Sequence, residues 1–479
     1  MSSPSDAAMR SCLQSVANLA ADFLASLSTR HVGGAVTPEE MIRELDRPLP
    51  EHRTPAEQVI RDLVSDVKRG LVASAGPRYF GFVVGGATPA SLMADWLTSA
   101  WDQNAQVYAT SPAAAAAEVI AARWIVELLG LPVHSSVGFV TGCQMANFTA
   151  LASGRNAVLE RAGWDVDSRG LFGAEPITVF MSECGHATVR SALHMMGVGS
   201  AQIREIPSDA QGRMQLSALE AEIRRASGQP MILSVQAGNV NSGAFEPIEA
   251  VADLVREENA WLHVDGAFGL WAAVSPELNG HLKGMERADS WAADAHKWLN
   301  VPYDSGIVIV KNPVQHRSLK TSRCAYAGEE SEGRRDGSSW APENSRRARA
   351  FVVYAVLREL GRAGVQDIVE RCCMLARCFA RGVTQIPGAQ VLNDVVLNQV
   401  LVRLGSTTAN GADALHRAVA ARLQAEGRCW LGTTTWRGHS ALRVSICNWM
   451  TTEDDIALVL ESLACAVRET TDGSACRDG

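Results

Sequence analysis

A lysine and an aspartate 32 positions apart are placed as covalent catalysis would need them. Lys297 follows His296 in a largely apolar stretch, and Asp265 closes the strand-like run 261–265. A lysine amine can form a Schiff base with an aldehyde, and a buried carboxylate can keep a pyridine nitrogen protonated. Apolar neighbours support this use, because they disfavour the charged ammonium. The pair indicates a pyridoxal phosphate site, although alone each has a simpler interpretation, a surface lysine and a turn-forming aspartate.

A second feature could bind an anion. Residues 138–147 are predicted to form a strand that turns tightly into a helix, which would leave backbone N–H groups free. A helix N-terminus of this kind suits a phosphate group, but the pattern is common in α/β proteins. The candidate phosphate contacts are Gly142, Cys143 and Gln144.

Several short motifs together resemble the pyridoxal-phosphate-dependent amino-acid decarboxylases, the family of the aromatic amino-acid, glutamate and tyrosine decarboxylases. The motifs are Ser111-Pro112 with Glu118, and residues 141–147, 183–186, 263–267, 294–298 and 442–445. The resemblance covers roughly residues 50 to 465. It implies an enzyme, a carboxy-lyase that uses pyridoxal 5'-phosphate to convert an L-amino acid to an amine and CO2, with an aromatic amino acid as one candidate substrate.

The resemblance also assigns roles to individual residues. Lys297 would carry the cofactor, Asp265 would face its ring nitrogen, and His186 would stack on the ring. A lone histidine is more often a capping or core residue, which is the alternative for His186. The implied cofactor contacts are Gly142, Cys143, Gln144, His186, Asn239, Asn241, Asp265, Ala267, His296 and Lys297.

Residues 318–344 are polar and glycine-bearing and lack periodicity, which predicts a mobile loop. Aromatic amino-acid decarboxylases carry a loop tyrosine that reprotonates the substrate carbon, and no tyrosine lies between positions 327 and 340. Tyr326, His186 and His439 are the candidate replacement acids. The gap leaves open a decarboxylating aldehyde synthase or another reaction such as transamination. A regulatory protein that binds the cofactor without turnover fits less well, because the lysine, aspartate and histidine are all present.

The region that lines the side-chain pocket of the family contains several aromatic and polar residues. They are Phe80, Trp101, Gln103, Asn104 and Tyr108. An aromatic lining would suit an aromatic substrate, but aromatic stripes are more often plain core. Arg443 could pair with the substrate carboxylate or form a structural ion pair.

Composition excludes several classes of protein. The net charge of -8 carries no long basic run, so nucleic acid is not expected as a partner. No apolar run approaches the roughly 20 residues that cross a bilayer, and the N-terminus lacks the basic start of a secretion signal, so we expect a cytoplasmic protein without a membrane partner. The 11 cysteines lack CxxC spacing, which disfavours disulfides and a metal site.

Short apolar runs alternate with helical stretches through the middle of the chain. The strand candidates are 138–141, 177–181, 231–235, 261–265 and 306–310. Strands alternating with helices predict an α/β protein with a mostly parallel sheet covered on both faces. The resemblance implies the aspartate-aminotransferase-like (type I pyridoxal-phosphate) fold.

The chain is expected to divide into three parts. These are an N-terminal helical segment (1–75), a large cofactor-binding domain with the mobile loop (76–345), and a linking helix with a small C-terminal α+β domain (346–479). Thr37 and Thr54 each begin a capping box with proline at the first helical position. The elements expected in the last part are a helix at 346–360 and strands at 391–402 and 442–447. By resemblance, the N-terminal segment packs over a partner subunit in a homodimer.

Overall fold

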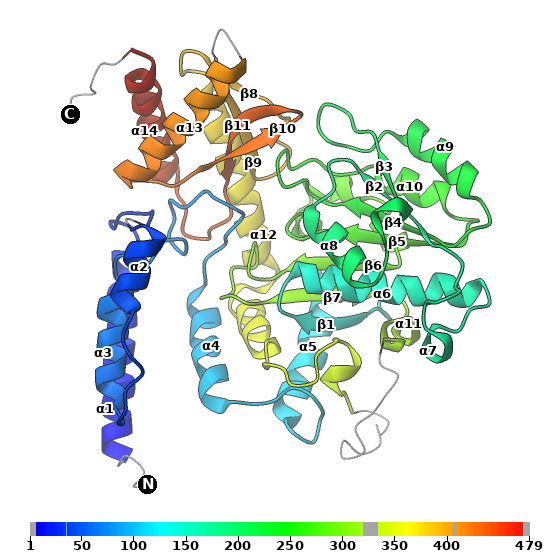
Figure 1. The fold of residues 1–479 in the computed structure, drawn as a ribbon, viewed down its shortest axis with the longest axis horizontal. Coiled ribbons are helices and arrows are strands. Elements are labelled where there is room, and N and C mark those ends of the chain that lie inside the picture. Colours follow the sequence, from blue (N-terminus) through cyan, green and yellow to red (C-terminus); the bar gives the residue numbers. More distant parts are fainter. Residues whose placement is uncertain (1–5, 35, 320–333, 406–408, 473–479) are drawn as a thin grey trace.

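A seven-stranded sheet is the centre of the structure, a computed structural model that describes residues 6–34, 36–319, 334–405 and 409–472 (Figure 1). In spatial order its strands are β1 (Ser136–Val140), β7 (Gly306–Val310), β6 (Ser290–Asp294), β5 (Ala260–Asp265), β4 (Met231–Gln236), β2 (Thr178–Ser182) and β3 (Ile203–Ile206). β7 runs antiparallel to both of its neighbours, and the other neighbouring strands are parallel. The predicted α/β fold with a mostly parallel sheet is confirmed.

Helices cover both faces of this sheet because alternate residues of each strand point to opposite sides. In β7, Ile307 and Ile309 belong to one buried cluster, while Val308 and Val310 belong to another. The second cluster includes α6 (Cys143–Arg161), which lies across β4 to β7. Gly154 of α6 permits close packing there, since a Cβ at this position would lie 2.6 Å from the Trp261 indole. The helix that begins at Cys143 is therefore held rigidly against the strands that end at the candidate site.

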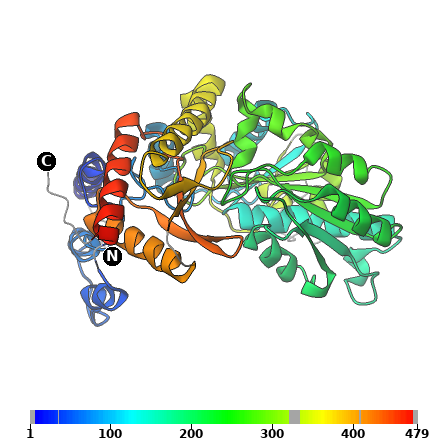
Figure 2. The ribbon, with the colours of Figure 1, turned by 90° about the horizontal axis from the view of Figure 1, so that it is seen from above.

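The N-terminal helices lie along one side of the molecule (Figures 1 and 2). They are α1 (Asp6–Ser26), α2 (Pro38–Leu45) and α3 (Ala56–Val67), and none of them contains a buried residue. The capping box at Thr37 is confirmed, with both reciprocal hydrogen bonds to Glu40 present. The predicted cap at Thr54 is wrong. The helix begins one residue later than expected, so Pro55 takes the cap position and no side chain caps the helix.

A second, antiparallel sheet lies near the C-terminus. Its order is β10 (Gly432–Trp436), β11 (His439–Ser445), β9 (Gln399–Leu404) and β8 (Ala389–Val391), flanked by α13 (Ala409–Glu426) and α14 (Glu453–Asp472). The single strand predicted at 391–402 is wrong, because irregular chain separates β8 from β9. The helical segment α12 (Ala350–Val383), which is kinked where Gly361 leaves the helical conformation (φ 58°), contacts α5 (Pro112–Leu128) as well as β8 and β9. It therefore links the two sheets, while the boundaries of the three expected parts stay a prediction.

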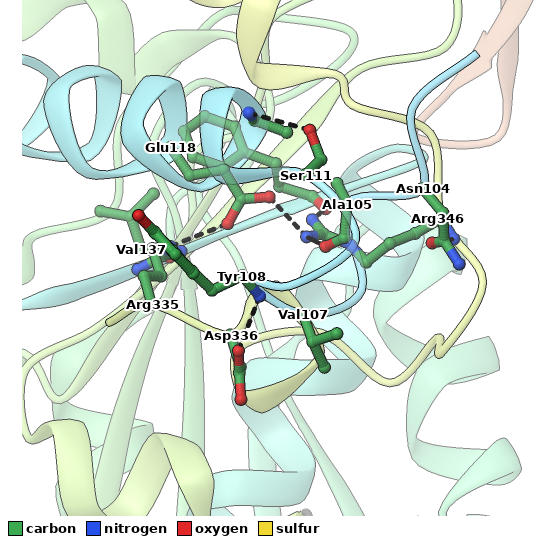
Figure 3. Close-up of polar contacts among 12 residues, drawn as sticks. Asn104, Ala105, Val107, Tyr108, Ser111, Glu118, Val137, Arg335, Asp336 and Arg346 are labelled. Carbon is green, nitrogen blue, oxygen red and sulfur yellow. Dashed lines mark hydrogen bonds and ion pairs between the residues drawn. The ribbon is translucent and has the colours of Figure 1, made fainter. Parts of the chain in front are cut away.

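A buried carboxylate joins α5 to the chain that follows residue 333 (Figure 3). Glu118 pairs with Arg335 at 2.8 Å and also with Arg346. Arg346 in turn donates to the Phe139 carbonyl at 2.7 Å, and Arg335 donates to the carbonyl of Val137. All three charged side chains are largely buried. Loss of the carboxylate alone would leave two buried guanidinium groups without a carboxylate, a change that typically costs about 3–5 kcal/mol.

The described residues contain neither a membrane-spanning helix nor a metal-binding cluster. None of the helices there is both long and apolar enough to cross a membrane. In the same part of the chain, histidine, cysteine, aspartate and glutamate side chains form no group that could hold a metal ion.

Candidate active site

The candidate site lies where β6 ends, and an ion pair holds its lysine. Lys297 Nζ lies 2.9 Å from Asp294 Oδ2, and the Asp294 side chain is only 3% exposed. Burial is the largest single influence and lowers the pKa of the Lys297 ammonium, but the charge and hydrogen bond of Asp294, with the nearby acidic groups of Cys143 and Asp265, together outweigh it and leave the pKa raised above its ordinary value. Asp294 therefore holds the amine in its charged form, so the expectation that apolar neighbours would disfavour the ammonium is wrong. Attack on an aldehyde requires the neutral amine, so Lys297 must first lose a proton.

The same carboxylate is bound by the N-terminus of α6. The amide of Cys143 donates to Asp294 Oδ1 at 2.6 Å, and His296 Nε2 lies 3.4 Å from the same oxygen. Gly142 precedes the helix, and a Cβ there would lie 3.3 Å from the His296 ring. The helix N-terminus thus binds an oxyanion in this structure, as its free amides and dipole lead one to expect.

Asp265 lies on the other side of Cys143 and is likewise buried. The Cys143 thiol lies 3.5 Å from Asp265 Oδ1, and one helical turn later Asn147 Oδ1 lies 2.9 Å from His263 Nε2. Burial, followed by the charges of Asp265 and Asp294, raises the pKa of Cys143 well above its ordinary value. The neutral thiol therefore donates to the Asp265 carboxylate and fixes its orientation. Together, the Cys143–Asp265 and Asn147–His263 contacts join α6 to β5 at two points one helical turn apart.

His186 is a helix cap, one of the two roles that the sequence left as alternatives, while its stacking on the cofactor ring stays a prediction. It caps α8 (Ala187–Met195), with Nδ1 accepting from the Thr188 amide at 3.3 Å. Burial lowers the pKa of His186, and the nearby charge of Asp265 opposes the shift while that of Lys297 adds to it. The ring is therefore neutral at pH 7, and because Nδ1 accepts, its proton sits on Nε2.

His296 is fixed beside the lysine by three contacts. Its Nδ1 accepts from the Ser305 amide at 3.1 Å, its Nε2 faces Asp294, and its ring stacks on Tyr303 with 4.3 Å between centroids. Burial lowers its pKa. Partial burial raises the pKa of Tyr303 to about 12, although the residue stays 61% exposed, and the charge of Lys297 opposes this shift. Sequence reasoning missed this phenol, since nothing in a lone tyrosine indicates that it would stack beside the lysine.

The remaining predicted cofactor contacts form hydrogen bonds or contacts with other parts of the protein. Asn239 accepts from the amides of Asn241 and Ser242 and so shapes its own turn, and Asn241 accepts from Thr434 Oγ1 at 2.8 Å. The exposed Gln144 side chain reaches Met195 Sδ at 3.9 Å. The carbonyl of Ala267 accepts from the Asp294 amide at 2.8 Å. The cofactor roles of Asn239, Asn241, Gln144 and Ala267 stay predictions.

The residues predicted to line the substrate pocket or to donate a proton occupy different environments in the structure. Phe80 is 1% exposed and belongs to the main core, so it is a packing residue. Trp101 packs edge-on against Phe351, and Tyr108 lies under Arg334. Arg443 donates to the Val240 carbonyl at 2.9 Å and interacts electrostatically with His186. The candidate acid His439 is exposed and is the first residue of β11, and Tyr326 lies outside the described residues.

The donors of this site fit pyridoxal phosphate. A phosphate needs free amides at a helix start, an aldehyde needs a buried amine, and a protonated pyridine nitrogen needs a buried carboxylate. The α6 N-terminus already binds a carboxylate, Lys297 reaches the same place, and Asp265 is buried beside them.

Comparison with known proteins gives one consistent result. The family model of the pyridoxal-dependent decarboxylase conserved domain matches residues 38–405. An aromatic-L-amino-acid decarboxylase of Bacillus atrophaeus is 26% identical over 475 residues, 96% of each chain. The tryptophan decarboxylase 1 of Oryza sativa subsp. japonica is 27% identical over 471 residues, 91% of this chain and 89% of its own.

Solved structures agree along almost the whole chain. The Oryza sativa TDC structure with PLP and tryptamine superposes with a TM-score of 0.92 at 25% identity, covering 98% of this chain and all of the other. The Rhodiola rosea 4-hydroxyphenylacetaldehyde synthase superposes with a TM-score of 0.87 at 22% identity, covering 99% and 100%. The fold is therefore shared by a protein whose structure contains an amine and by one named for the synthesis of an aldehyde.

Proposed function

The chain belongs to the pyridoxal-dependent decarboxylase family, and from that premise we propose that it converts an aromatic L-amino acid to the aromatic amine and CO2. It is a pyridoxal-phosphate-dependent carboxy-lyase that acts on an amino acid. Likeness along almost the full chain to proteins named for aromatic amino acids is the observation that carries the choice of substrate.

Each charged group at the site has a proposed task. Bound pyridoxal phosphate supplies a ring that absorbs the electrons left when CO2 departs. Lys297 binds the aldehyde covalently, and Asp265 holds a proton on the ring nitrogen. His186 lies against the ring with its Nε2 proton available, and the α6 N-terminus binds the phosphate. Since Arg443 makes no ion pair among the described residues, we propose that it orients the substrate carboxylate.

We further propose that the active form is a homodimer. The helices α1, α2 and α3 bury no residue, and α1 exposes Met9, Leu13, Val16 and Leu24. An apolar groove of about 820 Å³ between α1 and α4 (Pro89–Trp101) also includes Tyr303, which stacks beside the lysine. Exposed apolar surface of this extent usually marks an interface. Light scattering should give twice the mass of one chain, and a monomer would contradict the proposal.

We also propose that the enzyme is cytoplasmic. Several cysteines of the described residues are free, buried thiols, namely Cys143, Cys372, Cys373, Cys429 and Cys447. Proteins of oxidising compartments more often pair their cysteines, so this usage supports a reducing compartment. Expression with a fluorescent tag in the native cell tests the location, and export would contradict it.

The substrate is tested by comparing amino acids with the purified holoenzyme. We expect kcat/KM for L-tryptophan, L-tyrosine or L-phenylalanine to exceed that for L-glutamate by at least about 100-fold, because a buried unpaired side-chain carboxylate is costly. Mass spectrometry should find the amine together with CO2. A preference for L-glutamate would contradict the aromatic substrate, and an aldehyde released with ammonia and peroxide would contradict the amine product.

A further inference from the structure

We propose that Asp294 competes with the phosphate of the cofactor and thereby sets how tightly the protein holds pyridoxal phosphate. The inference goes beyond the choice of substrate, and it rests on the proposed binding of the phosphate at the α6 N-terminus. It assigns to Asp294 a positioning role that the motif 294–298 does not reveal by itself.

The contacts of Asp294 are those that the cofactor needs. Its Oδ1 accepts from the Cys143 amide at 2.6 Å, in the first turn of α6. Its Oδ2 lies 2.9 Å from Lys297 Nζ, the atom that must bind the aldehyde. Its Oδ1 also lies 3.4 Å from His296 Nε2, which belongs to an implied cofactor contact. One carboxylate thus binds three groups at once, and each of them is also assigned to the cofactor.

Two negative groups at one helix start must share a limited positive potential. The N-terminus of a helix carries the equivalent of roughly half an elementary charge, whereas a carboxylate and a phosphate together bring at least two negative charges. The amides of Gln144 and Met145 also lack intrahelical acceptors, so a phosphate could bind beside Asp294. It would then lie close to a buried carboxylate. Whether the phosphate displaces Asp294 or binds next to it, the carboxylate weakens the binding.

Asp294 also stabilises the protein by itself, because Lys297, whose side chain is only 20% exposed, would otherwise be an ammonium group without its ion-pair partner. Removing one partner of a buried pair is destabilising. The geometry therefore gives Asp294→Asn two effects of opposite sign. The free protein should become less stable, and the cofactor should bind more tightly. If Asp294 only maintained the shape of the site, its replacement would lower both the stability of the free protein and the affinity for the cofactor.

The test is equilibrium dialysis of the full-length holoenzyme against graded pyridoxal phosphate. We expect Asp294→Asn to lower the Kd by about 10-fold, since asparagine keeps an oxygen for the Cys143 amide but loses the charge. The affinity for pyridoxal, which lacks the phosphate, should increase much less in this variant. Thermal unfolding after removal of the cofactor should occur at a lower temperature in Asp294→Asn than in the wild type.

Asp304→Asn is the matched control. Asp304 is in the same segment and pairs with Arg349 at 2.9 Å, outside the contacts of the lysine. This variant should leave the Kd unchanged. If Asp294→Asn does not fold, Lys297→Ala with and without Asp294→Asn replaces the comparison, because the double variant removes both charges together. Tighter noncovalent binding by the double variant is then expected.

Two outcomes would overturn the proposal. One is an unchanged or higher Kd for pyridoxal phosphate in Asp294→Asn. The other is an equal increase in the affinity for pyridoxal, which would show that the substitution acts through Lys297 rather than through the phosphate. If the wild type failed to bind pyridoxal phosphate at all, the cofactor assignment itself would fall. The two failures are therefore distinguishable.

Discussion

Lys297→Ala should lower kcat/KM for decarboxylation by about 10⁴-fold and abolish the visible absorption of the lysine-bound cofactor. Losses of this size are typical when a residue that forms a covalent intermediate is removed. Lys297 is the described lysine that lies at the α6 N-terminus, within 2.9 Å of the Asp294 carboxylate. Absorption spectra and initial rates of CO2 release, measured on the same preparation, check both expectations.

Two further variants separate chemistry from packing. Lys297→Arg keeps a positive charge opposite Asp294 but cannot bind an aldehyde, so it should fold well and be as inactive as the alanine variant. Lys311→Ala removes a lysine whose Nζ contacts the carbonyls of Glu286 and Arg287, and it should keep full activity. Visible absorption that survives in both Lys297 variants would place the cofactor on another lysine.

The placement of Asp265 and of the turn at Gly142 was predictable from local sequence, because each carries a local signal. Asp265 was expected at the end of the strand at 261–265, and β5 ends there. Lys297 follows a histidine in apolar surroundings, and the turn at Gly142 leads from β1 into α6. The sheet then brings these points together, since the carboxyl ends of its parallel strands meet at one edge.

The role of Asp294 was not predictable in the same way. It ends β6, a strand of sequence SWAAD that contains no β-branched residue and was not among the strand candidates. This segment is a strand because β5 and β7 pair with it on both sides, and because α6 covers it. Such tertiary contacts override weak local propensity. The ion pair to Lys297 and the bond from Cys143 depend on that placement, so they could emerge only from the structure.

The arrangement of the small sheet was also beyond local sequence. The run 391–402 is apolar enough to predict one strand, yet Asn393 within it bonds to the Ser242 and Gln399 carbonyls and accepts from the Leu401 amide. Those bonds draw the chain out of the ladder between β8 and β9. A side chain that competes for backbone partners from a distant segment leaves no periodic signal.

Asp265→Asn should lower kcat by about 10³-fold while leaving the cofactor bound. Asparagine keeps the shape and can still accept from the Cys143 thiol, so the change removes mainly the charge that favours a protonated ring nitrogen. A loss of 10³-fold corresponds to about 4 kcal/mol of transition-state stabilisation, which is the size expected when a buried, oriented charge is lost. Single-turnover rates, with the Kd of the cofactor from dialysis, measure the two quantities separately.

The contrast with Lys297→Ala is what makes this result decisive. The lysine variant should lose the absorption band and the activity together, whereas Asp265→Asn should keep the band and lose the rate. Cys143→Ser provides the control, since a hydroxyl also donates to Asp265 and should leave kcat within about threefold. If Asp265→Asn kept a wild-type kcat, the carboxylate would not act on the ring nitrogen, and its burial beside Cys143 would be structural. If the variant lost the cofactor as well, Asp265 would serve binding rather than the flow of electrons.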